Sequence, residues 1–492
     1  MAEQKTQEEQ VAVDPAKVKR ADELKAEANQ YFGQAQYAQA IAVYSEAIEV
    51  LPSAVLYSNR AFANLRIEAF GLAIEDARKA MALDPRFVKA YYRLGSAYVA
   101  LGKYKHAFKV FKQCAKLAPK DPDVRKKLSL CEKEVKRQAF ESAIAMEDPK
   151  ALAETIDLGA MVIPDSYEGP KLGENDEVTE EFVNGMLDWM RDEKLIPKRI
   201  VASVLIQLRN LLVKLPSLID VEIPDEEGVY MSVLGDTHGQ FYDLLNIFKI
   251  NDKPSPKRPY LWNGDLCDRG SWSFETTFTA FAYKVLYPNS VFINRGNHET
   301  VNMNKMYGFE GEVTKKYDNN IMQLFTECFR ALPYAHCIEK KVLVVHGGLF
   351  KDDGVKLDEI RKIPRGCEPP ETGIASDILW SDPQPFNGRG PSKRGVGLSF
   401  GPDVTERFLK DNNLDLIIRS HEVREEGFLM EHNGKLITVF SAPNYCDQMG
   451  NKGALIRFRK NNMKPDPITF EAVPHPDLKP MAYASNLGMF GL

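Results

Sequence analysis

Five short apolar runs in the second half of the chain each lead into a residue type that binds metals, and this pattern limits the folds open to it. The first run, residues 229–234, continues into Gly235-Asp236-Thr237-His238-Gly239. A short apolar run is typical of a buried strand, and open α/β sheets bind ligands beyond the carboxyl ends of their strands. Glycines on both sides allow a sharp turn and a close approach to a ligand. Taken alone, Asp-x-His has a second interpretation, a surface turn with a solvated Asp and His.

Four repetitions of this arrangement argue against that second interpretation. The runs at 259–263, 291–293, 342–345 and 414–418 lead, in this order, to Gly264-Asp265-Leu266-Cys267-Asp268-Arg269-Gly270, Gly296-Asn297-His298-Glu299, His346-Gly347-Gly348 and Arg419-Ser420-His421-Glu422. Oxygen and imidazole ligands without thiolates suit Mn, Fe or Zn better than they suit a cysteine-rich structural zinc site. The five units together predict a metal site at the carboxyl ends of several strands.

In this order, the five motifs resemble those of the phosphoprotein phosphatase branch of the dinuclear metallophosphoesterases. Ser441-Ala442-Pro443-Asn444-Tyr445-Cys446 resembles a further signature of that branch. The resemblance implies an α/β metallophosphoesterase domain, a β-sandwich flanked by helices. It also implies hydrolysis of phosphoserine and phosphothreonine in proteins by direct attack of a metal-bridging hydroxide. Two positions depart from the family pattern: Cys267 replaces a β-branched or aromatic residue and Asn294 replaces Leu, and neither is a ligand position.

The resemblance also assigns roles to individual residues. It implies two divalent ions, with Mn²⁺ expected in vitro and Fe, Zn or Mg²⁺ as alternatives. Their ligands are Asp236 and His238 for one ion, Asn297, His346 and His421 for the other, and Asp265 as the bridge. A carboxylate suits the bridging position because it has two oxygens. His298 is the expected general acid, oriented by Asp268; from its position alone, a buried structural histidine is the alternative. The expected phosphate-binding residues are Arg269, Asn297, Arg394 and Tyr445.

An internal repeat with steps of 33 and then 34 residues precedes this domain. The corresponding positions are Ala28, Ala61 and Gly95; Ala40, Ala73 and Ala107; and Pro52, Pro85 and Pro119. This is the tetratricopeptide period, with a helix pair per repeat and small residues where helices cross. We therefore expect a tail at 1–20, an all-α solenoid of three tetratricopeptide repeats plus a capping helix at 21–145, a linker at 146–166, the catalytic domain at 167–480 and a C-terminal segment at 481–492.

Polar residues predicted on the first helix of each repeat indicate a binding groove. Lys25 and Asn29 share one helix face, as do Lys89 and Arg93, and Asn59 lies on the helix between them. These five residues match the carboxylate clamp of chaperone-binding tetratricopeptide proteins. The resemblance implies the acidic C-terminal tail of heat-shock protein 90 as partner, besides phosphoprotein substrates. The alternative is a solvated basic face.

Autoinhibition is the last property that the resemblance implies. In repeat-bearing members of the family, the repeats and the C-terminal segment hold the enzyme inactive, and chaperone tails or fatty acids activate it. Here the segment would be residues 481–492, which contain Leu487, Met489, Phe490 and Leu492, and Glu68 matches a contact position on the repeats. A frayed C-terminus is the alternative.

Composition excludes some partners and compartments. The net charge of -5 gives no sign of a nucleic-acid partner, and no apolar stretch reaches the roughly 18 residues of a membrane span. Seven cysteines without a Cys-x-x-Cys pair suggest free thiols in a reducing compartment, and the N-terminus lacks an apolar leader, so we expect the cytosol and nucleus. A monomer is also expected. Two other functions stay open: a phosphoesterase for small phosphodiesters, and a co-chaperone scaffold with low activity.

Overall fold

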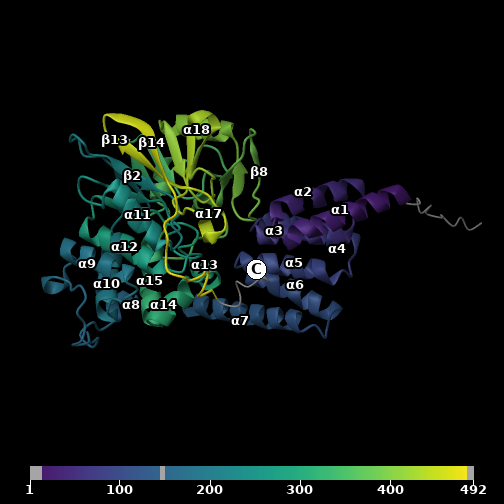
Figure 1. Cartoon of the computed structure of the whole chain (residues 1–492), viewed down its shortest axis with the longest axis horizontal. Coiled ribbons are helices and arrows are strands. Elements are labelled where there is room, and N and C mark those ends of the chain that lie inside the picture. Colours follow the sequence, from purple (N-terminus) through teal and green to yellow (C-terminus); the bar gives the residue numbers. More distant parts are fainter. Residues whose placement is uncertain (1–13, 145–149, 485–492) are drawn as a thin grey trace, which may run out of the picture. The chain divides into compact units, whose positions relative to one another are not determined.

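The computed structural model describes residues 14–144 and 150–484. The chain divides into two compact units, and the main boundary between them lies at residues 147 and 148 (Figure 1). None of the helices within the described ranges combines the length and hydrophobicity needed to cross a bilayer.

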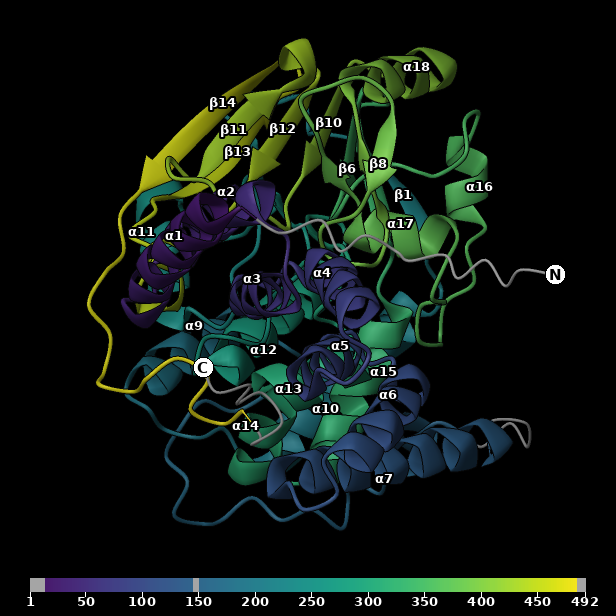
Figure 2. The same cartoon turned by 90° about the vertical axis from the view of Figure 1, so that its right-hand side faces the viewer.

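Helix pairs build the first unit, and Figure 2 shows them stacked with α7 at one end. Over the described residues the unit contains α1 (Pro15–Gly33), α2 (Tyr37–Val50), α3 (Ala54–Arg66), α4 (Phe70–Leu83), α5 (Val88–Ala100), α6 (Tyr104–Leu117) and α7 (Pro122–Ile144). The repeat's small residues lie where helices meet: Ala28 and Ala40 are fully buried, and a Cβ on Gly95 would lie 2.7 Å from the Phe111 ring. The prediction of one helix pair per repeat is confirmed.

Helix α1 begins at Pro15, inside the stretch predicted as a tail at 1–20. The Asp14 carboxylate accepts a hydrogen bond from the Ala16 N–H at 2.9 Å, and Pro15 occupies the first helical position. Both features favour helix initiation, which explains why the helix starts earlier than the repeat pattern. Residues 1–13 lie outside the described residues.

The region predicted as a linker, 146–166, is only partly described. Helix α8 (Leu152–Thr155) begins with the Leu152 N–H donating to the Glu327 carboxylate at 2.7 Å. Leu152, Ile156 and Met161 pack against the hydrophobic core of the second unit. This part of the linker region therefore belongs structurally to the second unit.

Two face-to-face β-sheets form the centre of the second unit. The six-stranded sheet has the order β1-β5-β6-β10-β12-β11, and the five-stranded sheet has the order β14-β13-β2-β3-β4. A third, small sheet has the order β7-β9-β8. Their bounds are β1 (Leu218–Val221), β2 (Met231–Leu234), β3 (Tyr260–Trp262), β4 (Val291–Ile293), β5 (Ala335–Ile338), β6 (Val342–Val345), β7 (Asp382–Pro383), β8 (Arg389–Pro391), β9 (Leu398–Phe400), β10 (Leu416–Arg419), β11 (Phe428–Glu431), β12 (Leu436–Val439), β13 (Gly453–Arg459) and β14 (Asn462–Phe470).

Alternating side chains divide each buried strand between two cores. In β6, Val342 and Val344 join the core between the sheets, whereas Leu343 and Val345 join the core beneath the helices. In β2, Met231 faces the sandwich and Leu234 faces the helices on the other side. Because both faces of the strand are buried, β6 is apolar at every position.

Helices cover both outer faces of the sandwich. The five-stranded sheet packs on α9 (Glu180–Arg191), α10 (Lys198–Leu212), α11 (Phe241–Asn251), α12 (Ser273–Leu286), α14 (Phe309–Lys316) and α15 (Asn319–Ala331). The six-stranded sheet packs on α16 (Leu357–Arg361), α17 (Ile374–Trp380) and α18 (Pro402–Asn412). The predicted fold, a tetratricopeptide solenoid followed by a β-sandwich flanked by helices, is confirmed.

Parallel strands bring the predicted site loops to one end of the sandwich. β2, β3 and β4 run parallel to one another, and so do β6 and β10. The two sheets meet at this end, where Asp236 forms an isolated bridge with Phe440. The loops that follow these five strands therefore converge.

Candidate metal centre

The six residues predicted as metal ligands all lie at this end of the sandwich. Each follows a strand closely: Asp236 and His238 follow β2, Asp265 follows β3, Asn297 follows β4, His346 follows β6 and His421 follows β10. All six are buried, with at most 6% of the residue surface exposed. The structure thus brings together residues that are as much as 185 positions apart (Asp236 and His421), linked by a hydrogen bond from the His421 N–H to Asp236.

Asp265 occupies the centre of this group. Its ligand atoms lie within 4.8 Å of those of His238 and His298 on one side, and of His346 and His421 on the other. One carboxylate oxygen, Oδ2, is 3.6 Å from His238 Nε2 and 3.3 Å from His346 Nε2. This is the position that a bridge between two ions requires.

Hydrogen bonds to the imidazoles orient them as metal ligands. His238 Nδ1 lies 2.9 Å from the Cys267 carbonyl, and His346 Nδ1 lies 2.8 Å from the Asn263 carbonyl. Because a carbonyl only accepts, each Nδ1 carries the proton and each Nε2 presents its lone pair toward Asp265. Asn297 Oδ1 is 2.8 Å from His346 Nε2, so the amide lies beside the same nitrogen.

Charge at the site also fits divalent cations. Burial and the neighbouring Asp265 raise the pKa of Asp236 to about 7. Burial lowers the pKa of both His238 and His346, which keeps the imidazoles neutral. Two adjacent buried carboxylates repel each other, and a divalent cation between them relieves this repulsion. Burial raises the pKa of the Cys267 thiol well above its usual value, so Cys267 is not a thiolate ligand.

Backbone strain is concentrated in the same loops. His238, Asp265, Asp268, Arg269 and His421 have φ values of 38°, 49°, 68°, 71° and 71°. L-residues seldom adopt this left-handed region, and such strain is typical of functional sites. A neighbouring glycine is needed for space, because a Cβ on Gly296 would lie 2.2 Å from Asp265 Oδ1.

His298, the predicted general acid, is fixed by Asp268. His298 Nδ1 is 2.8 Å from Asp268 Oδ2, and the Phe309 N–H donates to Asp268 Oδ1 at 2.9 Å. Asn304, on α13 (Val301–Tyr307), donates to Asp268 Oδ2 at 3.2 Å and to the His298 carbonyl at 2.7 Å. The sequence motifs do not reveal Asn304, since it lies six residues beyond His298 on a helix without a family signature.

Three of the predicted phosphate-binding residues border the metal residues. Arg269 directly follows Asp268, and its guanidinium carbon lies 3.7 Å from the Tyr307 ring centroid. The Tyr445 ring is 5.2 Å from the His238 ring. Asn297 is the third. Arg394 lies in the loop between β8 and β9, and its role in binding phosphate stays a prediction.

Glu299 and Glu422, the last residues of two of the motifs, shape the site loops. Glu299 accepts hydrogen bonds from the N–H groups of Asp265, Leu266 and Gly296, each at 2.8 Å. Glu422 accepts a hydrogen bond from Arg419 at 2.9 Å. Arg419 is fully buried and also donates to the Gly347 carbonyl at 2.6 Å. These bonds hold the loops of His346 and His421 together.

A chain of buried polar side chains connects the two sheets beneath the site. Asn263 donates to the Val345 carbonyl at 2.8 Å and to Ser420 Oγ at 2.9 Å. Asn294 donates to Asn263 Oδ1 at 2.7 Å, and His336 Nδ1 lies 2.8 Å from Asn294 Oδ1. Asn294, the departure from the family pattern, therefore reaches Asn263, whose carbonyl orients His346. A polar residue directly after an apolar strand was the available signal for Asn263.

The predicted clamp residues lie on α1, α3 and α5 of the first unit. Asn29 Oδ1 accepts hydrogen bonds from Tyr44 and, at 3.4 Å, from Asn59. Lys25 pairs with Asp22 at 2.6 Å on the exposed side of α1, and Lys89 is exposed.

Arg93 is the most buried cation of this set. Its guanidinium carbon lies 3.5 Å from the Phe62 ring centroid, and burial lowers the pKa of Arg93 to about 10. Within the described residues its Nε has no hydrogen-bond partner. A half-buried guanidinium with an unused donor is suited to an incoming anion.

The C-terminal segment passes beside the catalytic loops. The Met481 N–H donates to the Arg269 carbonyl at 2.8 Å, and Ser271 Oγ donates to the Lys479 carbonyl at 2.6 Å. Residues 480–483 form a turn, and 485–492, with Leu487, Met489, Phe490 and Leu492, lie outside the described residues.

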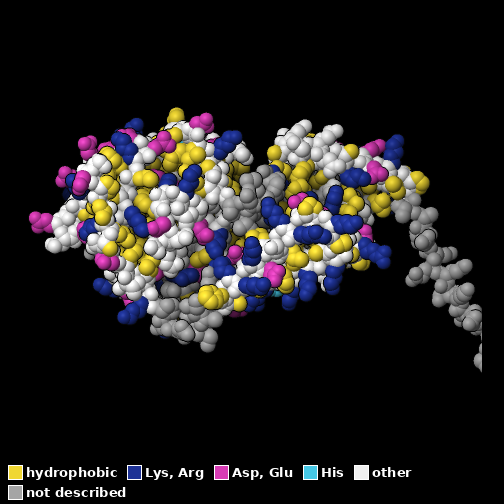
Figure 3. Space-filling view, turned by 90° about the horizontal axis from the view of Figure 1, so that it is seen from below, with side chains coloured by type: hydrophobic (Ala, Val, Ile, Leu, Met, Phe, Trp, Pro, Cys, Tyr) yellow, Lys and Arg dark blue, Asp and Glu magenta, His cyan; other side chains and the backbone are white. Residues whose placement is uncertain are grey.

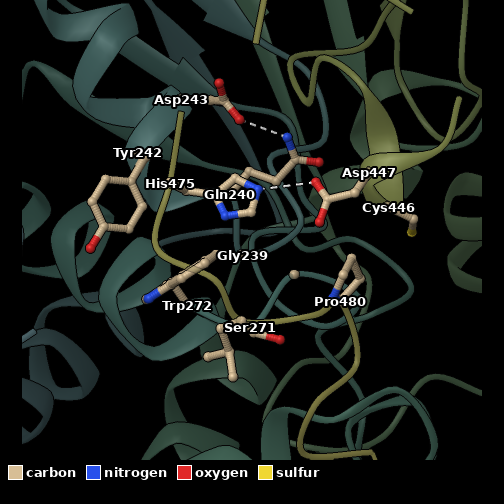
Figure 4. A pocket seen from close by; sticks show the side chains of 12 residues that line it. Gly239, Gln240, Tyr242, Asp243, Ser271, Trp272, Cys446, Asp447, His475 and Pro480 are labelled. Atoms are coloured by element: carbon tan, nitrogen blue, oxygen red, sulfur yellow. Dashed lines mark hydrogen bonds and ion pairs between the residues drawn. The ribbon is translucent and has the colours of Figure 1, made fainter. Parts of the chain in front are cut away.

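A small pocket opens between this segment and the loops (Figure 4). Gly239 and Ser271 line it from the loops after β2 and β3, and His475 and Pro480 line it from the stretch that leads into the C-terminal segment. His475 Nε2 lies 3.1 Å from Asp447 Oδ1, on the loop that carries Tyr445. The segment is thus tied to two loops of the site.

Comparisons with known proteins agree with this geometry. Residues 232–425 match the family model of the calcineurin-like phosphoesterases, 88–121 match a tetratricopeptide repeat, and 128–220 match the PPP5 TPR repeat region. The chain is 50% identical to human serine/threonine-protein phosphatase 5, over 96% of this chain and 95% of the relative. It is 51% identical to serine/threonine-protein phosphatase T of Trypanosoma brucei brucei, over 96% of this chain and 100% of the relative. A solved serine/threonine phosphatase from Saccharomyces cerevisiae is 46% identical with a TM-score of 0.60, over 62% of this chain and 99% of that one.

Proposed function

The chain belongs to the serine/threonine-protein phosphatase 5 family, and we propose that it hydrolyses phosphoserine and phosphothreonine in proteins. The observation that carries the proposal is the convergence of six ligand residues from five loops around Asp265, which is common to both ligand groups. A guanidinium, Arg269, and a histidine paired with a carboxylate, His298 with Asp268, border this group. Phosphoryl transfer to water needs these three elements.

Two divalent ions are the proposed cofactors. One ion would be held by Asp236 and His238, and the other by Asn297, His346 and His421. Asp265 would bind both ions. When bound, the ions supply Lewis acidity toward the phosphoryl oxygens and lower the pKa of a coordinated water. The set of oxygen and imidazole ligands favours Mn, Fe or Zn, with Mg²⁺ as a weaker competitor.

Proton delivery to the leaving group falls to His298. With Nδ1 engaged by Asp268, Nε2 is the nitrogen that can protonate the departing serine or threonine oxygen. The Phe309 N–H and Asn304 hold both ends of the Asp268 carboxylate, so the imidazole keeps one orientation. A fixed orientation allows the His298 imidazole to protonate the leaving oxygen as its bond to phosphorus breaks.

Phosphate binding falls to Arg269, Asn297, Arg394 and Tyr445. The Arg269 guanidinium rests on the Tyr307 ring, which limits its side-chain freedom before substrate arrives. A planar guanidinium meets two phosphoryl oxygens at once. The Tyr445 hydroxyl would add a donor on the side of His238.

Two alternatives fit less well. A phosphoesterase for small phosphodiesters would not need a repeat unit that binds peptides. The chain is also similar to serine/threonine phosphatases over nearly the full length of those proteins. A scaffold with an inactive enzyme fold would require a missing ligand, whereas all six ligand residues are present and buried together.

Hydrolysis assays with three substrates test the proposal: a phosphoserine peptide, an aryl phosphate and a bis-aryl phosphodiester. We expect activity on the first two with added metal. His298→Asn should lower turnover of the phosphoserine peptide by about 10²- to 10⁴-fold. Its effect on the aryl phosphate should be much smaller, because that leaving group needs little protonation. Preference for the diester, or equal losses on both monoesters, would contradict the assignment.

We further propose that the repeats bind the acidic C-terminal tail of heat-shock protein 90. The support is the pair Asn29–Asn59, the exposed Lys89 and the half-buried Arg93 with its unused donor, which together offer cations and amides to a carboxylate. The Lys25–Asp22 pair is exposed, so a peptide carboxylate can replace Asp22 at little cost.

Autoinhibition by the C-terminal segment is the regulatory part of the proposal. Its support is the attachment of Met481 to Arg269 and of Lys479 to Ser271, next to the phosphate-binding arginine. Chaperone tails and fatty acids are the proposed activators, and Glu68 is a proposed contact. Among the described residues none of the cysteines forms a disulfide, which suits the reducing environment of the proposed locations, cytosol and nucleus.

A further inference from the structure

Helix α6 of the repeat unit carries a concentration of positive charge that the proposed peptide groove does not use. Its four lysines are Lys105, Lys109, Lys112 and Lys116, and it contains no Asp or Glu. Residues 86–120 as a whole contain nine Lys and Arg and no acidic residue. The chain's net charge of -5 conceals this local surplus.

Helical spacing places the four lysines in one row. They are separated by four, three and four residues, so they share one face over about 16 Å. All four are exposed, while Ala107, Phe111 and Cys114 on the opposite face are buried. Figure 3 shows Lys and Arg side chains gathered over this unit.

Nearby carboxylates do not neutralise the row. On the neighbouring helix α7, Glu132 pairs with Lys136 and Glu134 pairs with Arg137. Across the described ranges, none of the four α6 lysines lies within ion-pair distance of an acidic side chain. The four lysines therefore form a row of positive charges that are exposed to solvent and not neutralised by carboxylates.

The other repeats show that the fold does not need these charges. The equivalent helix α2 contains two Glu and no Lys or Arg, and α4 contains two acidic and two basic residues. All three helices bury the same pattern of small and aromatic residues. Since the repeat architecture tolerates charges of -2, 0 and +4 at this position, the lysines serve a purpose other than folding.

We propose that the α6 row docks on an anionic membrane surface. Four to eight lysines on one helix face are typical of binding to acidic lipid headgroups. Arginine forks and exposed aromatic rings, which favour nucleic acids, are absent from α6: Tyr104 and Phe111 are buried and Phe108 is half-buried. Leu117, 38% exposed beside Lys116, offers an apolar contact at the same edge. The clamp residues lie on the first helices of the repeats, so the two surfaces are separate.

Vesicle co-sedimentation with the full-length protein tests this proposal. Phosphatidylcholine vesicles with and without phosphatidylserine are compared at low and high salt. Each lysine near such a surface contributes about fivefold in partitioning, so Lys109→Gln with Lys112→Gln should weaken binding about 25-fold. Lys17→Gln with Lys19→Gln, which removes the same charge from exposed positions on α1, should change binding little.

Several results would overturn the proposal. These are an absence of serine-lipid-dependent binding at low salt, equal losses in the two double variants, or binding that high salt does not weaken. Tighter binding of a single-stranded RNA or an acidic peptide than of the vesicles, through the same lysines, would assign the row to that partner instead. Lys and Gln have similar helix propensities, and unchanged circular dichroism would show that α6 is intact.

Discussion

Removal of the metals should make the catalytic unit less stable as pH rises through the neutral range. Burial and Asp265 raise the folded-state pKa of Asp236 from 3.8 to about 7. Between these values the metal-free folded protein binds more protons than the unfolded chain does. Stability therefore decreases as pH rises, and the loss is complete above about pH 7. A shift of about 3 units corresponds to about 4 kcal/mol in the free energy of unfolding.

Asp236→Asn isolates this contribution. The amide stays uncharged at every pH and can still accept the hydrogen bond from the His421 N–H. Because pH 5 already lies above the unfolded-state pKa of 3.8, the metal-free variant should be more stable than the metal-free wild type there by about 1.6 kcal/mol, and the two should match only below pH 3.8. At pH 8 it should be more stable by up to about 4 kcal/mol. With divalent metal the order should reverse, because only the wild type gains the full stabilisation of binding.

Tryptophan fluorescence during urea unfolding measures this unit selectively. All four tryptophans, Trp189, Trp262, Trp272 and Trp380, lie in the second unit. The control is Asp411→Asn, an equivalent change at an exposed carboxylate. Constant or rising stability of the metal-free wild type between pH 5 and 8 would refute the reasoning. The same slope in Asp236→Asn would also refute it.

Three further changes test other parts of the structure. Arg93→Ala should weaken binding of an acidic chaperone-tail peptide by about 2–5 kcal/mol in calorimetry, with Lys17→Ala as control; equal affinities would remove the clamp. Asn294→Leu leaves His336 and Asn263 without their partners at about 1–3 kcal/mol each, and should lower metal affinity about 10- to 100-fold. An unchanged urea midpoint and an unchanged metal titration would contradict that account. Deletion of residues 481–492 should raise basal turnover without changing metal content, and equal basal rates would disprove inhibition by this segment.

Local sequence was sufficient where neighbours along the chain determine the structure. The run 342–345 is apolar at every position, and the structure shows why: alternate residues face two different cores. The loop after it begins with His346 because a ligand must lie just beyond the strand end. The repeats could be predicted from the sequence equally well, since Gly95 and Phe111, which lie close together, belong to one helix pair. In each case, residues close in sequence carried the information.

Contacts between distant segments could not be predicted in this way. Asn304 reaches Asp268, 36 residues earlier, only because α13 packs against the loop after β3. The sequence pattern does not identify Asn304, since a single asparagine on a short helix has no characteristic spacing to other residues. Local capping preferences were also missed at Asp14, which extends α1 into the stretch predicted as a tail.

Asn294 shows why a position that binds no ligand can still act on the site. Asn294 departs from the family pattern at a position that is not a metal ligand, so the motifs assign it no role. The structure places it between His336 on one sheet and Asn263 on the other. Asn263 in turn holds Ser420, the neighbour of His421, and its carbonyl orients His346. A leucine here would leave two buried polar groups without partners, so Asn294 and His336 are expected to change together. The orientation of the metal ligands therefore depends on a pair that no motif contains.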